Sequence, residues 1–167
     1  MSVRLSRLLT FVAAVTLAAT GCSGSGDSPN TAKSEAGGRC RPVVRNDALP
    51  SWARKDFPQG GAQRHMVGEK GEIAAVLFGF PYHAPTAKGR ENKILWVPKD
   101  SEGAADMGPD DKLTIKASLA GTNEVVTRSI AGGPGPSLVD MPKPGCWKFS
   151  LSWPGHSDSL DVEYLAG

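Results

Sequence analysis

The sequence predicts an all-β protein whose folded part is a single antiparallel β-sandwich. A series of short stretches shows either the two-residue alternation or the continuous apolar run of a strand, and turn signals separate them roughly every ten residues. No stretch has a long helical period. The clearest strand is 144–153, where Trp147, Phe149, Leu151 and Trp153 fall on one face. Burial of such side chains is worth ~1.5–3 kcal/mol each, so we expect this strand to organise the core.

The beginning of the chain has the order of an export signal. Arg4 and Arg7 precede residues 8–19, an uncharged and mostly apolar run of 12 residues. A spanning helix needs ~20 residues, so this run is too short to be one. Residues 1–21 are therefore expected to be a signal peptide.

Cys22 follows the small residues Ala19, Thr20 and Gly21. This order is similar to a bacterial lipobox, in which the cysteine is lipidated and becomes the mature N-terminus. The similarity implies a lipoprotein signal peptide over 1–21, lipidation of Cys22, and a location at the outer face of the cytoplasmic membrane. Ordinary secretion, with cleavage near Ala18 or Ala19, is the alternative.

Residues 22–39 are rich in Ser and Gly and lack large apolar side chains, so we expect a flexible tether. The β-sandwich domain is then 40–167. Loss of Arg4 and Arg7 lowers the 19 basic residues to 17, which equals the 17 acidic ones. A neutral chain offers no electrostatic argument for a nucleic-acid partner, and the expected membrane contact is the lipid anchor.

The two remaining cysteines, Cys40 and Cys146, are an even number in a compartment that permits disulfides. We expect them to pair and to join the start of the domain to strand 144–153. Two buried free thiols are the alternative.

Within the domain we expect one helical turn at 49–58, where Trp52 and Phe57 form a lid on one end of the core. The run 73–80 is continuously apolar, which is typical of a central strand buried on both faces. The last two strands should form a C-terminal hairpin, and 137–141 an edge strand. In order, the expected strands are 42–44, 65–67, 73–80, 94–97, 113–119, 124–130, 137–141, 144–153 and 159–164.

Two of these strands, around Trp96 and around Cys146-Trp147, resemble those of immunoglobulin-like sandwiches, although the antibody Cys–Trp–Cys spacing is absent. The segments 92–97, 133–137 and 144–147 also resemble those of uncharacterised lipoproteins from high-GC Gram-positive (actinobacterial) bacteria. That resemblance implies an immunoglobulin-like β-sandwich and an envelope location, and it implies no activity.

Few residues point to chemistry. The folded part has no nucleophile elbow and no phosphate-binding fingerprint, so we expect no enzyme. His65, His83 and His156 are scattered, and the acidic loop 100–111 lacks the order of a calcium loop. We therefore assign no metal ligand and no cofactor.

The loop 81–92 is long for a connection and carries three recognition groups, Tyr82, His83 and Arg90. These three are the candidate ligand contacts; the other interpretation is that Tyr82 caps the core and the rest of the loop is solvated. The sequence thus predicts a membrane-anchored binding or interaction module for an unknown envelope protein or glycan. A lipoprotein that handles a small ligand or copper through its histidines and methionines is the second reading.

Overall fold

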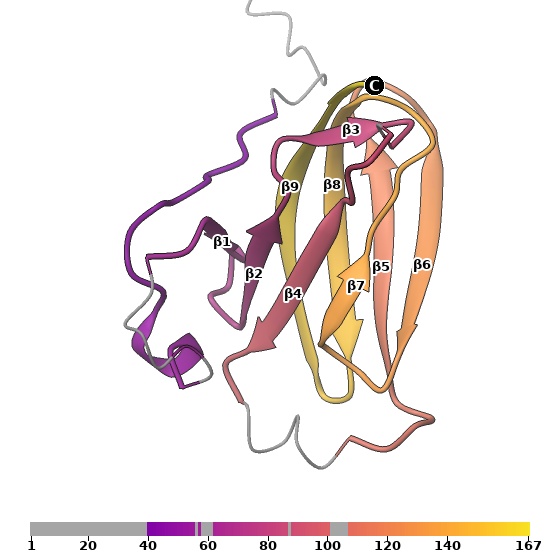
Figure 1. The fold of residues 1–167 in the computed structure, drawn as a ribbon. Coiled ribbons are helices and arrows are strands. Elements are labelled where there is room, and N and C mark those ends of the chain that lie inside the picture. The colour runs from indigo at the N-terminus through magenta and orange to yellow at the C-terminus, as the bar shows by residue number, and fades with distance from the viewer. Residues whose placement is uncertain (1–39, 56, 58–61, 87, 101–106) are drawn as a thin grey trace, which may run out of the picture. The chain divides into compact units, whose positions relative to one another are not determined.

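The computed structural model describes residues 40–55, 57, 62–86, 88–100 and 107–167, which all belong to one compact unit, Ser34–Gly167. They form two β-sheets packed face to face (Figure 1), which confirms the predicted β-sandwich. The expected signal peptide, residues 1–21, and tether, residues 22–39, lie outside the described residues. In the described ranges, no helix is both long and apolar enough to cross a membrane.

The first sheet has four strands in the order β1-β2-β4-β7, and every neighbouring pair is antiparallel. The strands are β1 (His65–Val67), β2 (Ile73–Phe78), β4 (Lys93–Pro98) and β7 (Pro136–Leu138). The short β7 lies at the edge of the sheet, as predicted for the segment 137–141.

The second sheet has five strands in the order β3-β9-β8-β5-β6. They are β3 (Tyr82–Ala84), β5 (Lys112–Leu119), β6 (Val125–Ala131), β8 (Gly145–Trp153) and β9 (His156–Ala166). The predicted C-terminal hairpin is confirmed as β8 and β9. The β3 strand corrects the sequence analysis, which placed a loop there. It pairs with β9 in parallel, a long-range contact that local alternation cannot reveal.

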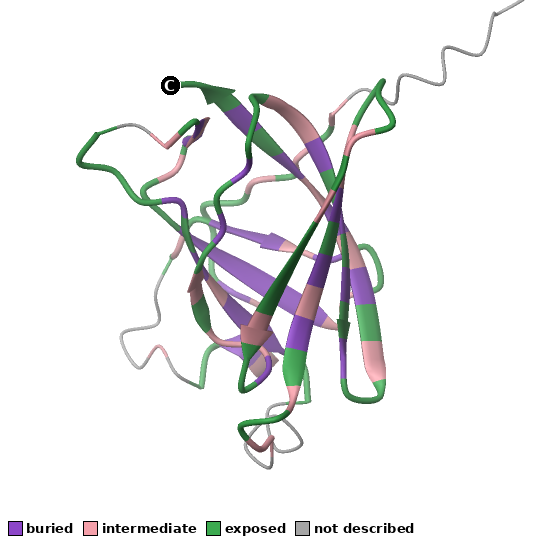
Figure 2. Ribbon diagram, turned by 90° about the vertical axis from the view of Figure 1, so that its right-hand side faces the viewer, coloured by how far each residue is buried: buried purple, intermediate pink, exposed green. Residues whose placement is uncertain are grey.

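The core fills the space between the sheets, and the banding of buried and exposed residues along the strands follows the predicted alternation (Figure 2). On β8, Trp147, Phe149, Leu151 and Trp153 are buried, whereas the residues between them are exposed. Buried aromatic groups also satisfy their polar atoms, since the Trp96 indole donates to the Ser137 hydroxyl at 3.0 Å.

The β2 strand is buried on both faces, as its continuous apolar run predicts. Its inner side chains join the main core, and its outer side chains Ala74 and Val76 form a second cluster with Leu49 and Ala53. Ala53 belongs to a short 3-10 helix, Ser51–Ala53, which lies over the outer face of the first sheet. Trp52 and Phe57 pack against the same cluster, so they cover an outer sheet face and not an end of the core.

The expected strand 42–44 is not formed. The chain pairs with β1 only through a single bridge, in which Arg45 and His65 exchange backbone hydrogen bonds of 2.8 and 3.0 Å. Nearby, Cys40 and Cys146 form the predicted disulfide, across 106 residues of sequence. The bond fastens the start of the described chain to β8. The immunoglobulin-like topology expected from the resemblance stays a prediction.

Candidate functional site

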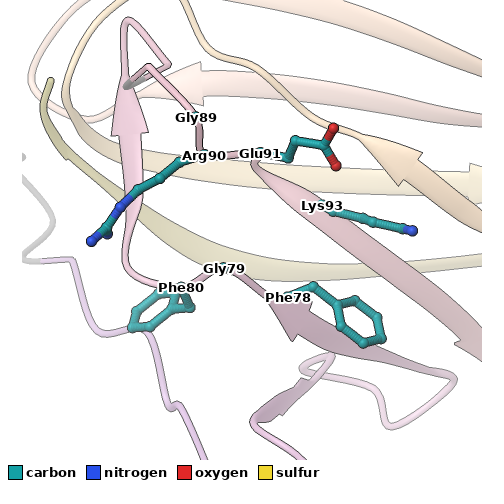
Figure 3. A pocket seen from close by; sticks show the side chains of 7 residues that line it. All are labelled: Phe78, Gly79, Phe80, Gly89, Arg90, Glu91 and Lys93. Atoms are coloured by element: carbon teal, nitrogen blue, oxygen red, sulfur yellow. The ribbon is translucent and has the colours of Figure 1, made fainter.

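An open groove of about 810 Å³ lies where β2 ends and β4 begins (Figure 3). Its walls come from the last residue of β2, the two ends of the segment that joins β2 to β4, and the first residue of β4. The lining residues are Phe78, Gly79, Phe80, Gly89, Arg90, Glu91 and Lys93.

A smaller hollow of about 310 Å³ continues the groove toward β7. The two share Glu91 and Lys93, and the smaller one adds Pro136, Ser137 and Leu138. We call the combined surface the cross-strand groove and define it by Phe78, Phe80, Arg90, Glu91, Lys93 and Leu138.

One row of residues runs across the sheet beneath this groove. Lys93 is the register partner of Phe78 on one side and of Leu138 on the other. Directly paired residues point to the same face, so all three side chains lie on the outer face of the first sheet. Phe78 is 39% exposed and Leu138 is 57% exposed.

The groove is the part of this outer face that the N-terminal segment leaves open. Further along the same strands, Val76 and Val97 are buried in the second cluster, beneath the segment that contains Leu49 and Ala53. The outer face thus carries apolar side chains along β2 and β4, and those at the Phe78–Leu138 end are left exposed to solvent.

Charged groups line the groove. The ammonium of Lys93 lies 5.8 Å from the centre of the Phe78 ring, and the guanidinium of Arg64 lies 5.7 Å from that of Phe80. Arg90 and Glu91 form no hydrogen bond or ion pair within the described part of the chain. By contrast, Lys143 binds Glu124 at 2.6 Å elsewhere on the surface.

Asn92 stands between Glu91 and the first residue of β4, and its polar side chain is only 3% exposed. Its amide group donates to the His83 carbonyl at 2.9 Å and to the Asp140 carboxylate at 2.8 Å, and its carbonyl oxygen accepts from the His83 N–H at 3.1 Å. Both ends of this buried amide therefore have hydrogen-bond partners. These bonds fix the chain next to Arg90 and Glu91 to β3 and to Asp140.

Gly79 permits the chain to turn at the end of β2. Its φ is +73°, and a Cβ atom there would stand 2.8 Å from the Glu91 carbonyl oxygen. Both the conformation and the close approach therefore require glycine.

Tyr82, predicted to contact a ligand, belongs to the core. The side chain is fully buried, and its hydroxyl donates to the Lys93 carbonyl at 2.7 Å. Burial raises the pKa of Tyr82, since it disfavours the charged form. Tyr82 therefore supports the groove from inside and offers no surface to a partner, which corrects the expectation.

The other two predicted residues are separated. The ring of His83 is half-buried at the contact of β3 with β9, with Nδ1 at 2.9 Å from the Ala166 carbonyl oxygen, and it does not line the groove. Arg90 does line it. Of the three residues, the structure brings only Arg90 to a hollowed surface.

The histidines do not gather into a metal site. His65 is 1% exposed, His83 lies beside β9, and His156 stacks on Trp153 with ring centres 5.5 Å apart. The His156 ring also lies 3.8 Å from a Glu72 oxygen. Among the described residues there is no group of three or more His, Cys, Asp or Glu side chains that could hold a metal ion.

Sequence reasoning missed Phe78, Phe80, Lys93 and Leu138. A continuous apolar run gave no reason to separate Phe78 from the buried part of β2, and Leu138 belongs to a strand distant in sequence. The available signal was local: Gly79 and Pro81 interrupt the apolar run, and such residues mark the point where a strand ends.

The chain was compared with protein-family models, with curated proteins and with solved structures. None of the three comparisons gave a match.

Proposed function

We propose that this protein is a lipid-anchored binding module of the cell envelope, and that its β-sandwich binds a partner through the cross-strand groove. The observation that carries the proposal is the uncovered row Phe78–Lys93–Leu138. It combines two exposed apolar side chains and a cation on one hollowed surface.

The composition of the groove supports binding more than catalysis. Aromatic and arginine side chains are enriched at protein interfaces, and they contribute most when a partner removes them from water. Arg90 and Glu91 have free hydrogen-bonding capacity that a partner can use. Because the row belongs to a strand-paired sheet of the sandwich, its backbone is already ordered, and binding costs little conformational entropy.

The anchor is the second half of the proposal and rests on the sequence of residues 1–22. Wild-type protein should partition into the detergent phase after cell fractionation, and its intact mass should exceed that of residues 22–167 by the mass of a lipid. Cys22→Ala should remain unprocessed or be released. An unmodified wild-type N-terminus would refute the anchor.

The groove is tested on solubilised membranes by native gel electrophoresis. We expect wild-type protein to migrate in a larger complex and Leu138→Ser to migrate alone. Val125→Ser is the matched control, because Val125 is an aliphatic residue of similar exposure, 50%, on β6 of the other sheet. A complex that survives Leu138→Ser, or is lost equally in Val125→Ser, would contradict the proposed site.

A further inference from the structure

The distance between the two apolar side chains of the groove indicates which secondary structure a bound segment of a partner has. This inference rests on the proposed function. Phe78, Lys93 and Leu138 occupy register positions on three neighbouring strands. Neighbouring strands lie ~4.8 Å apart, so the two apolar positions are ~9.6 Å apart and the lysine lies midway between them.

An α-helix matches this spacing. Its residues i and i+7 are ~10.5 Å apart on one face, and residues i+3 and i+4 of that face lie between them. In an extended strand, the residues on the same face as residue i lie ~6.7 Å (i+2) and ~13 Å (i+4) away from it. In a polyproline helix, the next residue on the same face (i+3) lies ~9.3 Å away, and no residue of that face lies between the two. Of the three, only the helix combines a spacing near ~9.6 Å between two side chains with a further side chain of the same face between them.

The charges favour an acidic occupant. Three side chains on or beside the groove are basic, Arg64, Arg90 and Lys93. Among the lining residues one is acidic, Glu91, which lines both hollows together with Lys93. The ammonium of Lys93 lies over the Phe78 ring, so a partner's carboxylate that pairs with Lys93 is held beside an apolar surface. The excess of basic groups therefore favours an acidic partner, and Phe78 and Leu138 favour apolar side chains on it.

We propose that the cross-strand groove binds an amphipathic, acidic helix of a partner protein, laid across β2, β4 and β7. Apolar side chains at i and i+7 pack on Phe78 and Leu138, and an acidic side chain at i+3 or i+4 pairs with Lys93. This is the helix-in-groove mode of recognition, with the groove formed by a sheet face.

The test uses three fluorescein-labelled, alanine-based helical peptides and the purified full-length protein, with binding read as fluorescence anisotropy. The first peptide has leucine at i and i+7 and glutamate at i+3 and i+4. The second replaces both glutamates by glutamine. The third keeps the composition of the first but moves one leucine to the opposite face.

We expect the first peptide to bind, the second to bind about three- to fivefold more weakly, and the third not to saturate. Lys93→Gln should abolish the difference between the first two peptides. Lys116→Gln should preserve it, since Lys116 is an exposed lysine on the outer face of the other sheet.

Equal binding of all three peptides, or of none, would overturn the acidic helix. A wild-type dimer in sedimentation that Leu138→Ser dissociates would also overturn it, because the occupant would then be a second copy. If peptide binding fails while the native-gel complex still depends on Leu138, the proposed function stands and only the nature of the partner is wrong.

Discussion

Lys93 faces Phe78 across the β2–β4 pair with its ammonium 5.8 Å from the ring centre, while the residue next to it, Ile94, is fully buried. Two consecutive residues of β4 therefore belong to two different surfaces. The outer row is available to a partner, whereas Leu77 and Ile94 of the inner row belong to the core between the sheets.

We therefore expect substitutions in the outer row to change the stability little and substitutions in the inner row to reduce it strongly. Lys93→Gln and Leu138→Ala should each change the free energy of unfolding by less than about 1 kcal/mol, as surface substitutions do. Ile94→Ala should cost about 2–5 kcal/mol, because it leaves a cavity in the core. Urea denaturation followed by tryptophan fluorescence measures both. A loss above about 2 kcal/mol in Leu138→Ala would make the outer row structural.

The buried carboxylate of Asp158 joins the start of β9 to the turn before β2. It accepts hydrogen bonds from the backbone N–H groups of Lys70 and Glu72, both at 2.8 Å, and of Ser159 at 2.7 Å. In Asp158→Asn, the side-chain NH2 group would face backbone N–H donors from which it cannot accept a hydrogen bond. The free energy of unfolding should therefore fall by about 2–4 kcal/mol. Asp161→Asn, on the same strand and only half-buried, is the control and should cost less than about 0.5 kcal/mol. Equal losses in the two variants would contradict the role of Asp158.

Gly68 is required at the same junction for space, since a Cβ atom there would overlap the Asp158 carboxylate. Gly68→Ala should therefore destabilise the protein by about 1–3 kcal/mol, as overpacking does. Combining it with Asp158→Ala, which removes the obstructing group, should give a loss smaller than the sum of the two single losses. If denaturant titrations show that the two losses in unfolding free energy simply add, residues 68 and 158 are not in contact.

The only two tyrosines, Tyr82 and Tyr164, are both buried, and burial raises the pKa of each. A tyrosine with a raised folded-state pKa contributes stability that is complete below the unfolded value of ~10 and is lost as the pH rises above it. We expect no tyrosinate absorbance at 295 nm in the native protein near pH 10, and its appearance only together with unfolding. Tyrosinate formed near pH 10 with unchanged near-ultraviolet circular dichroism would contradict this burial.

The Cys40–Cys146 bond closes a loop of roughly one hundred residues, for which the chain-entropy model gives ~4.7 kcal/mol. At ~2–8 °C per kcal/mol for domains of this size range, reduction should therefore lower the melting temperature by about 10 °C or more. Peptide mapping without reduction should recover the two cysteines as one linked pair. Alkylation of either thiol in native, unreduced protein would show that the bond is absent.

The sequence predicted the parts of the fold that depend on local periodicity. The alternation from Trp147 to Trp153 and the hairpin after it were both readable, because side-chain period and turn residues act over a few positions. The parallel pairing of β3 with β9 was not, since its partners are about 80 residues apart in sequence. For the same reason the sequence left open whether Tyr82 contacts a ligand or caps the core.

The candidate site was predicted only in part. Arg90 lies in the segment that the sequence singled out, but Phe78 and Leu138 meet through Lys93, on three strands that are consecutive in space and not along the chain. Phe78 is exposed because the segment around Leu49 packs over Ala74 and Val76 but not over Phe78. The sequence pattern of β2 itself does not show how far this segment extends.

Photo-crosslinking in intact cells tests most directly whether the cross-strand groove is the face that contacts a partner. A benzophenone amino acid is placed at position 138 in one variant and, as control, at position 150, an exposed serine on the outer face of β8. We expect one discrete crosslinked species from position 138, lost when Lys93→Glu is added, and none from position 150. Crosslinks of equal yield from both positions, or from position 150 alone, would contradict it.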